Sequence, residues 1–172
     1  MPILGAFILP HPPIILPEVG RGEERKIQNT IDACRETAGR IAALKPDTIV
    51  LTSPHTALYG DYFHISPGEK AMGDLRRFGV AGVKLEAEYD SEFVKLLEKT
   101  AGDAGLSAGT LGERDSALDH GTLIPLYFLN EIMTGCKLVR IGLSGLPVLD
   151  HYRLGKCISK TAEALGRRVV FI

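Results

Sequence analysis

Two histidines stand in similar positions, each directly after a proline that follows an apolar stretch of chain. His11 lies in the segment LPHPP and His55 in the segment TSPHT. The carboxyl ends of parallel strands meet at one edge of a sheet, so loops that follow such strands can bring their side chains together. Imidazole is a common metal ligand, and we therefore predict that His11 and His55 bind one metal ion. The alternative is that each ring only bonds a backbone carbonyl of its own loop.

A third histidine, His120, lies in the segment LDHGTLIPL, where Gly121 allows a close approach of the backbone. Pro125 suits the first turn of a helix that begins near this histidine. Asp119 could orient the His120 imidazole, although adjacent side chains usually point apart. A polar loop that opens a helix explains the same residues equally well, so the spacing alone leaves the role of His120 open.

The other histidines and the cysteines have simpler explanations. His64 alternates with apolar neighbours in a predicted strand, which favours a surface position. His151 follows Asp150, which we expect to cap a helix. Cys34 and Cys157 lie among apolar residues of predicted helices and are expected to be packing residues. No cysteine has the spacing of a zinc site.

Strands and helices alternate along the chain. Apolar or β-branched runs predict strands, and apolar residues three and four apart predict helices. Strand–helix–strand units build parallel sheets, so we predict an α/β fold in which helices flank a central, largely parallel or mixed sheet. The predicted strands cover residues 4–9, 48–52, 62–66, 137–143 and 168–172, and the predicted helices cover residues 23–44, 91–101 and 152–165.

The segment from Pro67 to Gly82 is rich in glycine and shows little periodicity. We predict a long loop there, and long loops in compact domains are often functional. Such a loop could cover the site and exclude water from it. Candidates for the wall of a binding pocket follow His55, although core packing explains them at least as well; they are Tyr59, Tyr62 and Phe63.

The composition argues against several classes of protein. The 172 residues carry 20 Lys and Arg against 21 Asp and Glu, which disfavours nucleic acid or an anionic membrane as the main partner. Prolines interrupt the apolar N-terminus, and no apolar run reaches the roughly 20 residues of a membrane span. Three cysteines without a paired framework favour a reducing, cytoplasmic location. The P-loop, GxGxxG, GxSxG and HExxH motifs are absent, so no cofactor-binding residues are predicted.

The final residues, RVVFI, predict a strand, whereas chain termini are usually polar and frayed. We therefore expect residues 1–172 to form a single domain that is truncated at its C-terminus. An apolar strand left unpaired there would favour association, so a homo-oligomer is one expectation.

Three segments of the chain together resemble a known family. They read LPHPPIILPEVG, SPHTALYGDYF and LDHGTLIPLYFL, in this order. The chain resembles the class III extradiol ring-cleavage dioxygenases, most of all the LigB-type catalytic subunit, in the branch that includes the Memo-like (AmmeMemoRadiSam) proteins. Members of this family have an α/β fold with a central sheet, which agrees with the predicted elements.

The resemblance implies roles for the three histidines. It implies that His11 and His55 ligate a non-haem Fe(II) ion, and that His120 is an acid/base that lies beside the ion without ligating it. In the family a third ligand, Glu or His, follows a late strand. No such residue is identifiable in this chain, which ends at Ile172.

The resemblance also implies an activity, the insertion of O2 into a catechol-like aromatic substrate with ring opening. One alternative is a Memo-like protein that binds a metal or a peptide on the same scaffold without ring cleavage. Another is a metal-dependent hydrolase that uses Zn²⁺, because imidazole and carboxylate ligands suit both ions.

Overall fold

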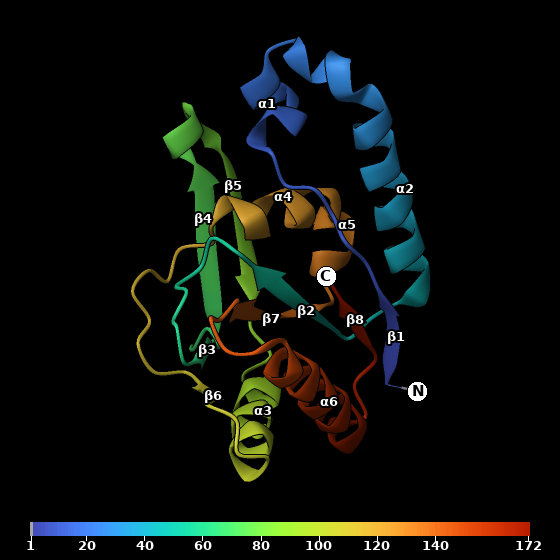
Figure 1. Ribbon diagram of the computed structural model, residues 1–172. Helices are drawn as coiled ribbons and strands as arrows, with labels where there is room; N and C mark the ends of the chain where they lie inside the picture. The colour runs from blue at the N-terminus through green and yellow to red at the C-terminus, as the bar shows by residue number, and fades with distance from the viewer. Residues whose placement is uncertain (1) are drawn as a thin grey trace.

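Four parallel strands form the central sheet of the protein (Figure 1). The computed structural model describes residues 2–172, except for the side chains of residues 131 and 132. The strand order is β1-β8-β2-β7, and each neighbouring pair is parallel. The strands are β1 (Ile3–Ala6), β8 (Val169–Phe171), β2 (Thr48–Ser53) and β7 (Lys137–Gly142).

Helices cover both faces of this sheet, which confirms the predicted α/β class in a single compact domain (Figure 1). One face carries α2, α4 and α5, and the other carries α3 and α6, which pack against each other. The helices are α2 (Gln28–Leu44), α3 (Ser91–Asp103), α4 (His120–Phe128), α5 (Asn130–Met133) and α6 (Val148–Leu165). None of the described helices is both long enough and apolar enough to cross a membrane.

The central strands are largely apolar, as is usual for a parallel sheet that is covered on both faces. Successive side chains of a strand point to opposite faces, and β2 shows this directly. Ile49 and Leu51 belong to the core beneath α2 and α4, whereas Val50 belongs to the core beneath α3 and α6. All three side chains are fully buried.

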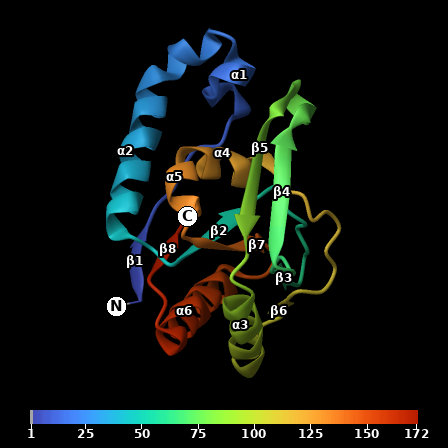
Figure 2. The same cartoon turned by 180° about the vertical axis from the view of Figure 1, so that it is seen from behind.

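The predicted loop from Pro67 to Gly82 is wrong. The chain forms an antiparallel hairpin of β4 (Lys70–Leu75) and β5 (Val80–Glu88), which stands beside α4 when the molecule is seen from behind (Figure 2). The connection is the short helix η3 (Arg76–Phe78), followed by Gly79 at a φ of 78°. In β4 the buried positions include Ala71 and Gly73, and these small residues conceal the alternation that predicts a strand.

Smaller elements complete the chain. A two-residue strand, β3, pairs in parallel with β6, and three short helical segments connect β1 to α2. They are β3 (Phe63–His64), β6 (Ala108–Gly109), η1 (Pro13–Ile15), α1 (Pro17–Gly20) and η2 (Glu23–Ile27).

Several predicted bounds change. The first strand ends at Ala6, and Ile8 is 99% exposed. The helix predicted from residue 23 begins with η2 and continues as α2. The cap predicted for Asp150 is wrong, because α6 already begins at Val148 and Asp150 pairs with Arg153 within the helix.

The last strand, β8, lies inside the sheet between β1 and β2. Its backbone is paired on both sides, so it is not the unpaired edge that we expected. Association through this strand therefore loses its physical reason, and a homo-oligomer stays a prediction without that support.

A buried carboxylate joins three elements at the amino edge of the sheet. Asp90 is fully buried and caps α3 by accepting a hydrogen bond from the backbone N–H of Phe93 at 3.2 Å. It also accepts hydrogen bonds from the Thr48 hydroxyl at 2.7 Å and from Arg167 Nε at 3.1 Å. Burial raises the pKa of Asp90, but these hydrogen bonds and the Arg167 charge outweigh it and hold the pKa below its ordinary value.

Replacing Asp90 should therefore cost stability in a pH-dependent way. We expect Asp90→Asn to lower the free energy of unfolding by about 3 kcal/mol at pH 7, because it leaves buried donors without their charged partner. The depressed pKa means that this contribution is complete above the unfolded-state pKa of about 3.9 and is lost as the pH falls through the folded value. Urea unfolding at several pH values measures it.

The matched control is Asp47→Asn, which weakens a more exposed pair with Arg168. Exposed pairs contribute little, so the control should cost less than about 1 kcal/mol. An equal loss in both variants, or a loss at Asp90 that does not shrink in acid, would contradict the assignment.

Candidate active site

The structure brings the three predicted histidines together at the carboxyl edge of the sheet. His11 lies in the loop after β1, His55 in the loop after β2, and His120 is the first residue of α4. The Nε2 atoms of His11 and His55 are 3.1 Å apart. The ring centroid of His120 lies 3.9 Å from that of His55 and 6.0 Å from that of His11.

The parallel sheet explains why His11 and His55 meet. Both β1 and β2 pair with β8 in the same direction, so the loops that follow them leave the sheet at one edge. Pro10 and Pro54 directly precede the two histidines and restrict the backbone where each loop turns. Two residues that are 44 positions apart in the sequence thereby share one site.

A hydrogen bond between two side chains fixes His120 relative to His55. The Ser53 hydroxyl donates to Asp119 Oδ1 at 2.6 Å and accepts from the backbone N–H of His55 at 3.2 Å. Asp119 also caps α4, because its Oδ1 accepts from the Thr122 N–H at 3.1 Å. Asp119 thus positions His120 through the start of the helix.

The predicted place of Pro125 is wrong. We expected this proline in the first turn of a helix, but α4 begins at His120, so Pro125 lies in the second turn. Asp119 sets the start of the helix as its N-cap, and this interaction outweighs the preference of proline for the first turn.

Gly121 allows the start of α4, which carries His120, to lie close to the loop that carries His55. A Cβ atom at this position would lie 2.5 Å from Ser53 Oγ and 2.9 Å from both Asp119 Oδ1 and His55 Cδ2. These distances are far below van der Waals contact, and the neighbouring atoms belong to the site itself. Any larger residue must therefore displace His55, Ser53 or Asp119.

The surroundings of His120 favour its neutral form. Burial and the neighbouring His55 charge lower the pKa of His120, and Asp119 opposes this shift only in part. A neutral imidazole has one free nitrogen lone pair and can accept a proton. The His120 ring can therefore act as a base near neutral pH.

A cavity of about 660 Å³ opens beside His55 and His120. Its opposite wall is the β4–β5 hairpin, where Met72 and Phe78 supply apolar surface. The ring of Phe78 lies 5.2 Å from that of His120. The segment predicted to cover the site therefore does line it, as a hairpin rather than a loop.

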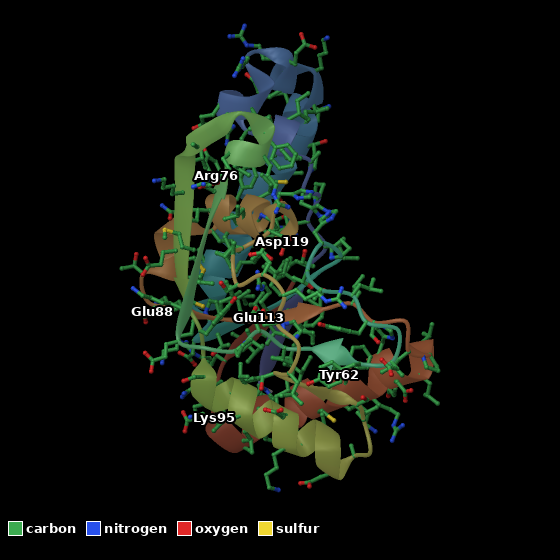
Figure 3. All side chains as sticks on the ribbon, turned by 90° about the vertical axis from the view of Figure 1, so that its left-hand side faces the viewer. Tyr62, Arg76, Glu88, Lys95, Glu113 and Asp119 are labelled. Atoms are coloured by element: carbon green, nitrogen blue, oxygen red, sulfur yellow. The ribbon has the colours of Figure 1, made fainter. Side chains whose placement is uncertain are left out.

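The aromatic residues predicted as pocket walls do not line this cavity. In Figure 3, Tyr62 lies farther from Asp119 than Glu113 does, and it lies nearer to α3. Its hydroxyl accepts a hydrogen bond from the Leu111 N–H at 3.2 Å, and Tyr59 donates to the Gly112 carbonyl. Phe63 is buried in the core. Tyr59 and Tyr62 thus hold the chain at Leu111 and Gly112, and Phe63 is a core residue, so core packing describes these rings better than a pocket wall.

The predicted surface position of His64 is wrong, because this side chain is only 2% exposed. Its Nδ1–H donates to the Leu111 carbonyl at 3.1 Å, and its Nε2 lies 3.8 Å from Glu113 Oε1. The strand alternation places the His64 side chain on the face opposite to the side chains of its apolar neighbours. The chain at Leu111, 47 residues later in the sequence, covers that face.

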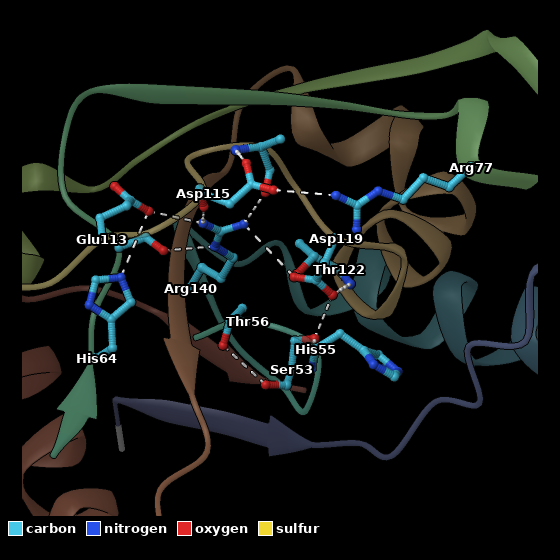
Figure 4. A network of polar contacts seen from close by, with 12 residues as sticks. Ser53, His55, Thr56, His64, Arg77, Glu113, Asp115, Asp119, Thr122 and Arg140 are labelled. Atoms are coloured by element: carbon cyan, nitrogen blue, oxygen red, sulfur yellow. Dashed lines mark hydrogen bonds and ion pairs between the residues drawn. The ribbon is translucent and has the colours of Figure 1, made fainter. Parts of the chain in front are cut away.

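Sequence reasoning missed Arg140, a charged residue in the apolar strand β7. Its side chain is 2% exposed and lies at the centre of the polar network that links Glu113 to Asp119 (Figure 4). The only sequence signal is an arginine in an otherwise apolar run, KLVRIGL. Buried charges are rare unless they are paired, so this pattern indicates partners elsewhere in the chain.

The donor atoms of His11 and His55 fit two positions on one metal ion. Imidazole nitrogens bind such ions at about 2.0–2.1 Å, so adjacent ligands of one ion lie about 3 Å apart. The observed 3.1 Å between the Nε2 atoms has this value. Among the side chains that the structure describes, however, no group of three or more His, Cys, Asp or Glu residues is arranged to hold an ion.

Comparison with known proteins gives the family. The model of the catalytic LigB subunit of aromatic ring-opening dioxygenase matches residues 5–172. The chain belongs to this family. The match agrees with the resemblance seen in the three histidine segments and supports an extradiol-type dioxygenase scaffold.

A protein of Clostridium acetobutylicum is similar to the whole chain. It is 34% identical over 179 residues, an alignment that covers 100% of this chain and 38% of the relative. The chain therefore spans well under half the length of that curated relative.

The close contact at Gly121 gives a test of the site geometry. We expect Gly121→Ala to lower the free energy of unfolding by about 1–3 kcal/mol, because the added methyl group displaces Ser53 or His55. If His11 and His55 bind Fe(II), as the resemblance implies, the variant should also bind this ion more weakly than the parent protein in an anaerobic titration. Chemical unfolding and the titration measure the two effects.

Gly155→Ala is the matched control, since a Cβ atom at this position of α6 meets no atom within 4 Å. It should raise stability by about 0.5–1 kcal/mol, the usual difference between the two residues in a helix. If Gly121→Ala raises stability as Gly155→Ala does, the start of α4 is not in close contact with the loop that carries His55.

Proposed function

We propose that this chain is a non-haem Fe(II)-dependent extradiol-type dioxygenase domain that opens the ring of a catechol-like substrate. The observation that carries the proposal is the geometry of the three histidines in a member of the LigB family. Two imidazole Nε2 atoms lie 3.1 Å apart, and a third imidazole lies beside them without joining a group of three ligands.

In this proposal His11 and His55 hold the ion. A bound Fe(II) ion would let an electron-rich catechol reduce O2, since imidazole-ligated Fe(II) with open positions is typical of oxygenases. Among the described residues no third His, Cys, Asp or Glu joins His11 and His55 in a group that could hold an ion, so the proposal assigns two ligands to this chain. The chain itself holds these two rings at the separation that adjacent ligands require.

His120 acts as the acid/base of the reaction. A catechol must lose a proton to become electron-rich, and the neutral His120 imidazole can take it. The protonated ring can later return this proton to the oxidised product. The start of α4 holds His120 next to His55, so the proton is accepted close to the proposed metal ligands.

The hairpin wall gives the substrate its place. A cavity of about 660 Å³ is large enough for a single aromatic ring with substituents. Met72 and Phe78 offer apolar surface to such a ring and reduce the access of water to the histidines. Both oxygen atoms of O2 enter the product, so no further reductant is needed.

Direct assay tests this activity. The protein is loaded with Fe(II) under anaerobic conditions, mixed with a panel of catechols and then exposed to O2. We expect yellow ring-opened products and consumption of one O2 per ring. If the iron-loaded protein yields no product across a broad panel, the activity is not extradiol cleavage.

Substitution of the histidines should separate binding from turnover. We expect His11→Ala and His55→Ala to abolish retention of Fe(II), because each leaves a single protein ligand. His120→Ala should keep the metal and slow turnover about 10²- to 10⁴-fold, the usual scale for a lost acid/base. Metal analysis after gel filtration and single-turnover kinetics measure the two effects.

His151→Ala is the control, because His151 lies on α6 against Phe63 and outside the cavity. It should leave both metal content and turnover unchanged. Loss of iron in His120→Ala would mean that the roles of the three histidines are assigned wrongly.

Two alternatives lead to different results in the same experiments. A Memo-like binding protein would retain a metal or a peptide and give no ring-opened product. A hydrolase on the same ligands would be purified with zinc rather than iron when oxygen is excluded. Iron in the protein as isolated, together with product formation, supports the dioxygenase over both.

A further inference from the structure

The segment from Glu113 to Asp119 leads directly into His120 but contains no strand or helix of its own. The Leu118 N–H donates to the Met72 carbonyl of β4 at 3.1 Å, and side-chain contacts add to this backbone bond. Arg140 of β7 points into this segment and contacts four of its residues, which are Glu113, Asp115, Ala117 and Asp119 (Figure 4). One guanidinium group thus holds the segment at several points, in addition to the contacts that Ser53, His64 and Arg77 make with it.

The Arg140 guanidinium bonds the segment at several points. Its Nη1 donates to the Ala117 carbonyl at 2.7 Å, and its Nη2 donates to Glu113 Oε1 at 3.2 Å and to the Asp115 carbonyl at 3.4 Å. On the sheet side, Nε donates to the Ser66 hydroxyl at 2.7 Å. Nη1 also lies 3.8 Å from Asp119 Oδ2, which forms an ion pair with it.

These contacts engage four of the five N–H donors of Arg140. A guanidinium has five N–H groups, and the fifth, on Nη1, has only the Asp119 ion pair at 3.8 Å, which is longer than a hydrogen bond. The side chain is also only 2% exposed, although it borders the cavity. Its engaged donors and its burial favour an effect on the reaction through the residues that it holds.

From these contacts we propose that Arg140 is a positioning residue that sets the place of His120 in the site. The guanidinium fixes Ala117 and Asp119, and Asp119 caps α4, whose first residue is His120. The planar fork of arginine makes these contacts in one fixed arrangement, which the point charge of lysine cannot reproduce. This inference rests on the proposed function, because it assigns Arg140 to the reaction of His120.

The chain contains a matched arginine far from the site. Arg167 pairs with Asp90, which caps α3 through the Phe93 N–H, just as Arg140 pairs with Asp119, which caps α4 through the Thr122 N–H. Both arginines support an aspartate at a helix start. Only Arg140 does so beside the three histidines.

The first test compares Arg140→Lys with Arg167→Lys in the Fe(II)-loaded protein. We expect Arg140→Lys to keep its iron and its KM within about twofold and to lose about 10- to 100-fold in kcat, the scale of a displaced catalytic group. Arg167→Lys should lower stability and leave kcat unchanged. Equal kcat values in the two variants would make Arg140 a structural residue only and would overturn the proposal.

The second test needs no turnover. In the metal-free protein, hydrogen exchange of the Thr122 amide reports the cap at Asp119, and exchange of the Phe93 amide reports the cap at Asp90. Arg140→Lys should speed exchange at Thr122 and shift the His120 ring resonances, with Phe93 unchanged; Arg167→Lys should show the reverse. An unchanged Thr122 amide and His120 ring in Arg140→Lys would overturn the proposal.

The two tests separate the inference from the proposed function. If the parent protein opens no catechol ring, the proposed function fails, and the exchange data still decide whether Arg140 positions His120. If Arg140→Lys does not fold, Glu113→Gln replaces it, because Glu113 contacts the guanidinium from the outer side. Glu113→Gln should speed hydrogen exchange at the Thr122 amide and lower kcat by less than the loss expected for Arg140→Lys. If neither the exchange rate nor kcat changes, the proposal is overturned.

Discussion

The hydrogen bond from the Ser53 hydroxyl to the Asp119 carboxylate is the interaction on which the site depends. It joins the end of β2 to the start of α4, two points that are 66 residues apart in the sequence. Ser53 also holds the backbone of His55, and Asp119 caps the helix that begins with His120. Among the described contacts, this bond is the most direct link between the loop that carries His55 and the start of the helix that carries His120. The absence of a side chain at Gly121 is what lets the bond form.

The electrostatics of the site follow from the same arrangement. A carboxylate enclosed between two loops needs a compensating charge, and Arg140 supplies it from the neighbouring strand β7. Among the described ion pairs none involves the three imidazoles, and burial lowers the pKa of His120 although Asp119 opposes the shift in part. A neutral histidine beside two converging ring nitrogens suits proton transfer next to a metal ion. The contacts of Asp119 with Ser53 and Arg140 therefore hold in place the histidine that the proposed chemistry uses.

Local patterns predicted the sheet, most of the helices and the meeting of His11 with His55. The apolar run of β2 and the proline before each histidine carry that information within a few residues. The hairpin was missed because small residues occupy buried positions of β4. His64 and Arg140 were misjudged or overlooked for a different reason: residues distant in sequence, such as Leu111 and Glu113, cover or pair with them. The residues that neighbour His64 or Arg140 in the sequence do not reveal such distant partners.

The central claim is that His11 and His55 hold one Fe(II) ion and that His120 stays outside its ligand set. X-ray absorption spectroscopy of the Fe(II)-loaded protein measures this most directly, since the scattering of imidazole rings reveals how many bind the iron. The account predicts two imidazoles per iron in the parent protein and the same two in His120→Ala. Three imidazoles in the parent, or one fewer in His120→Ala than in the parent, would contradict it.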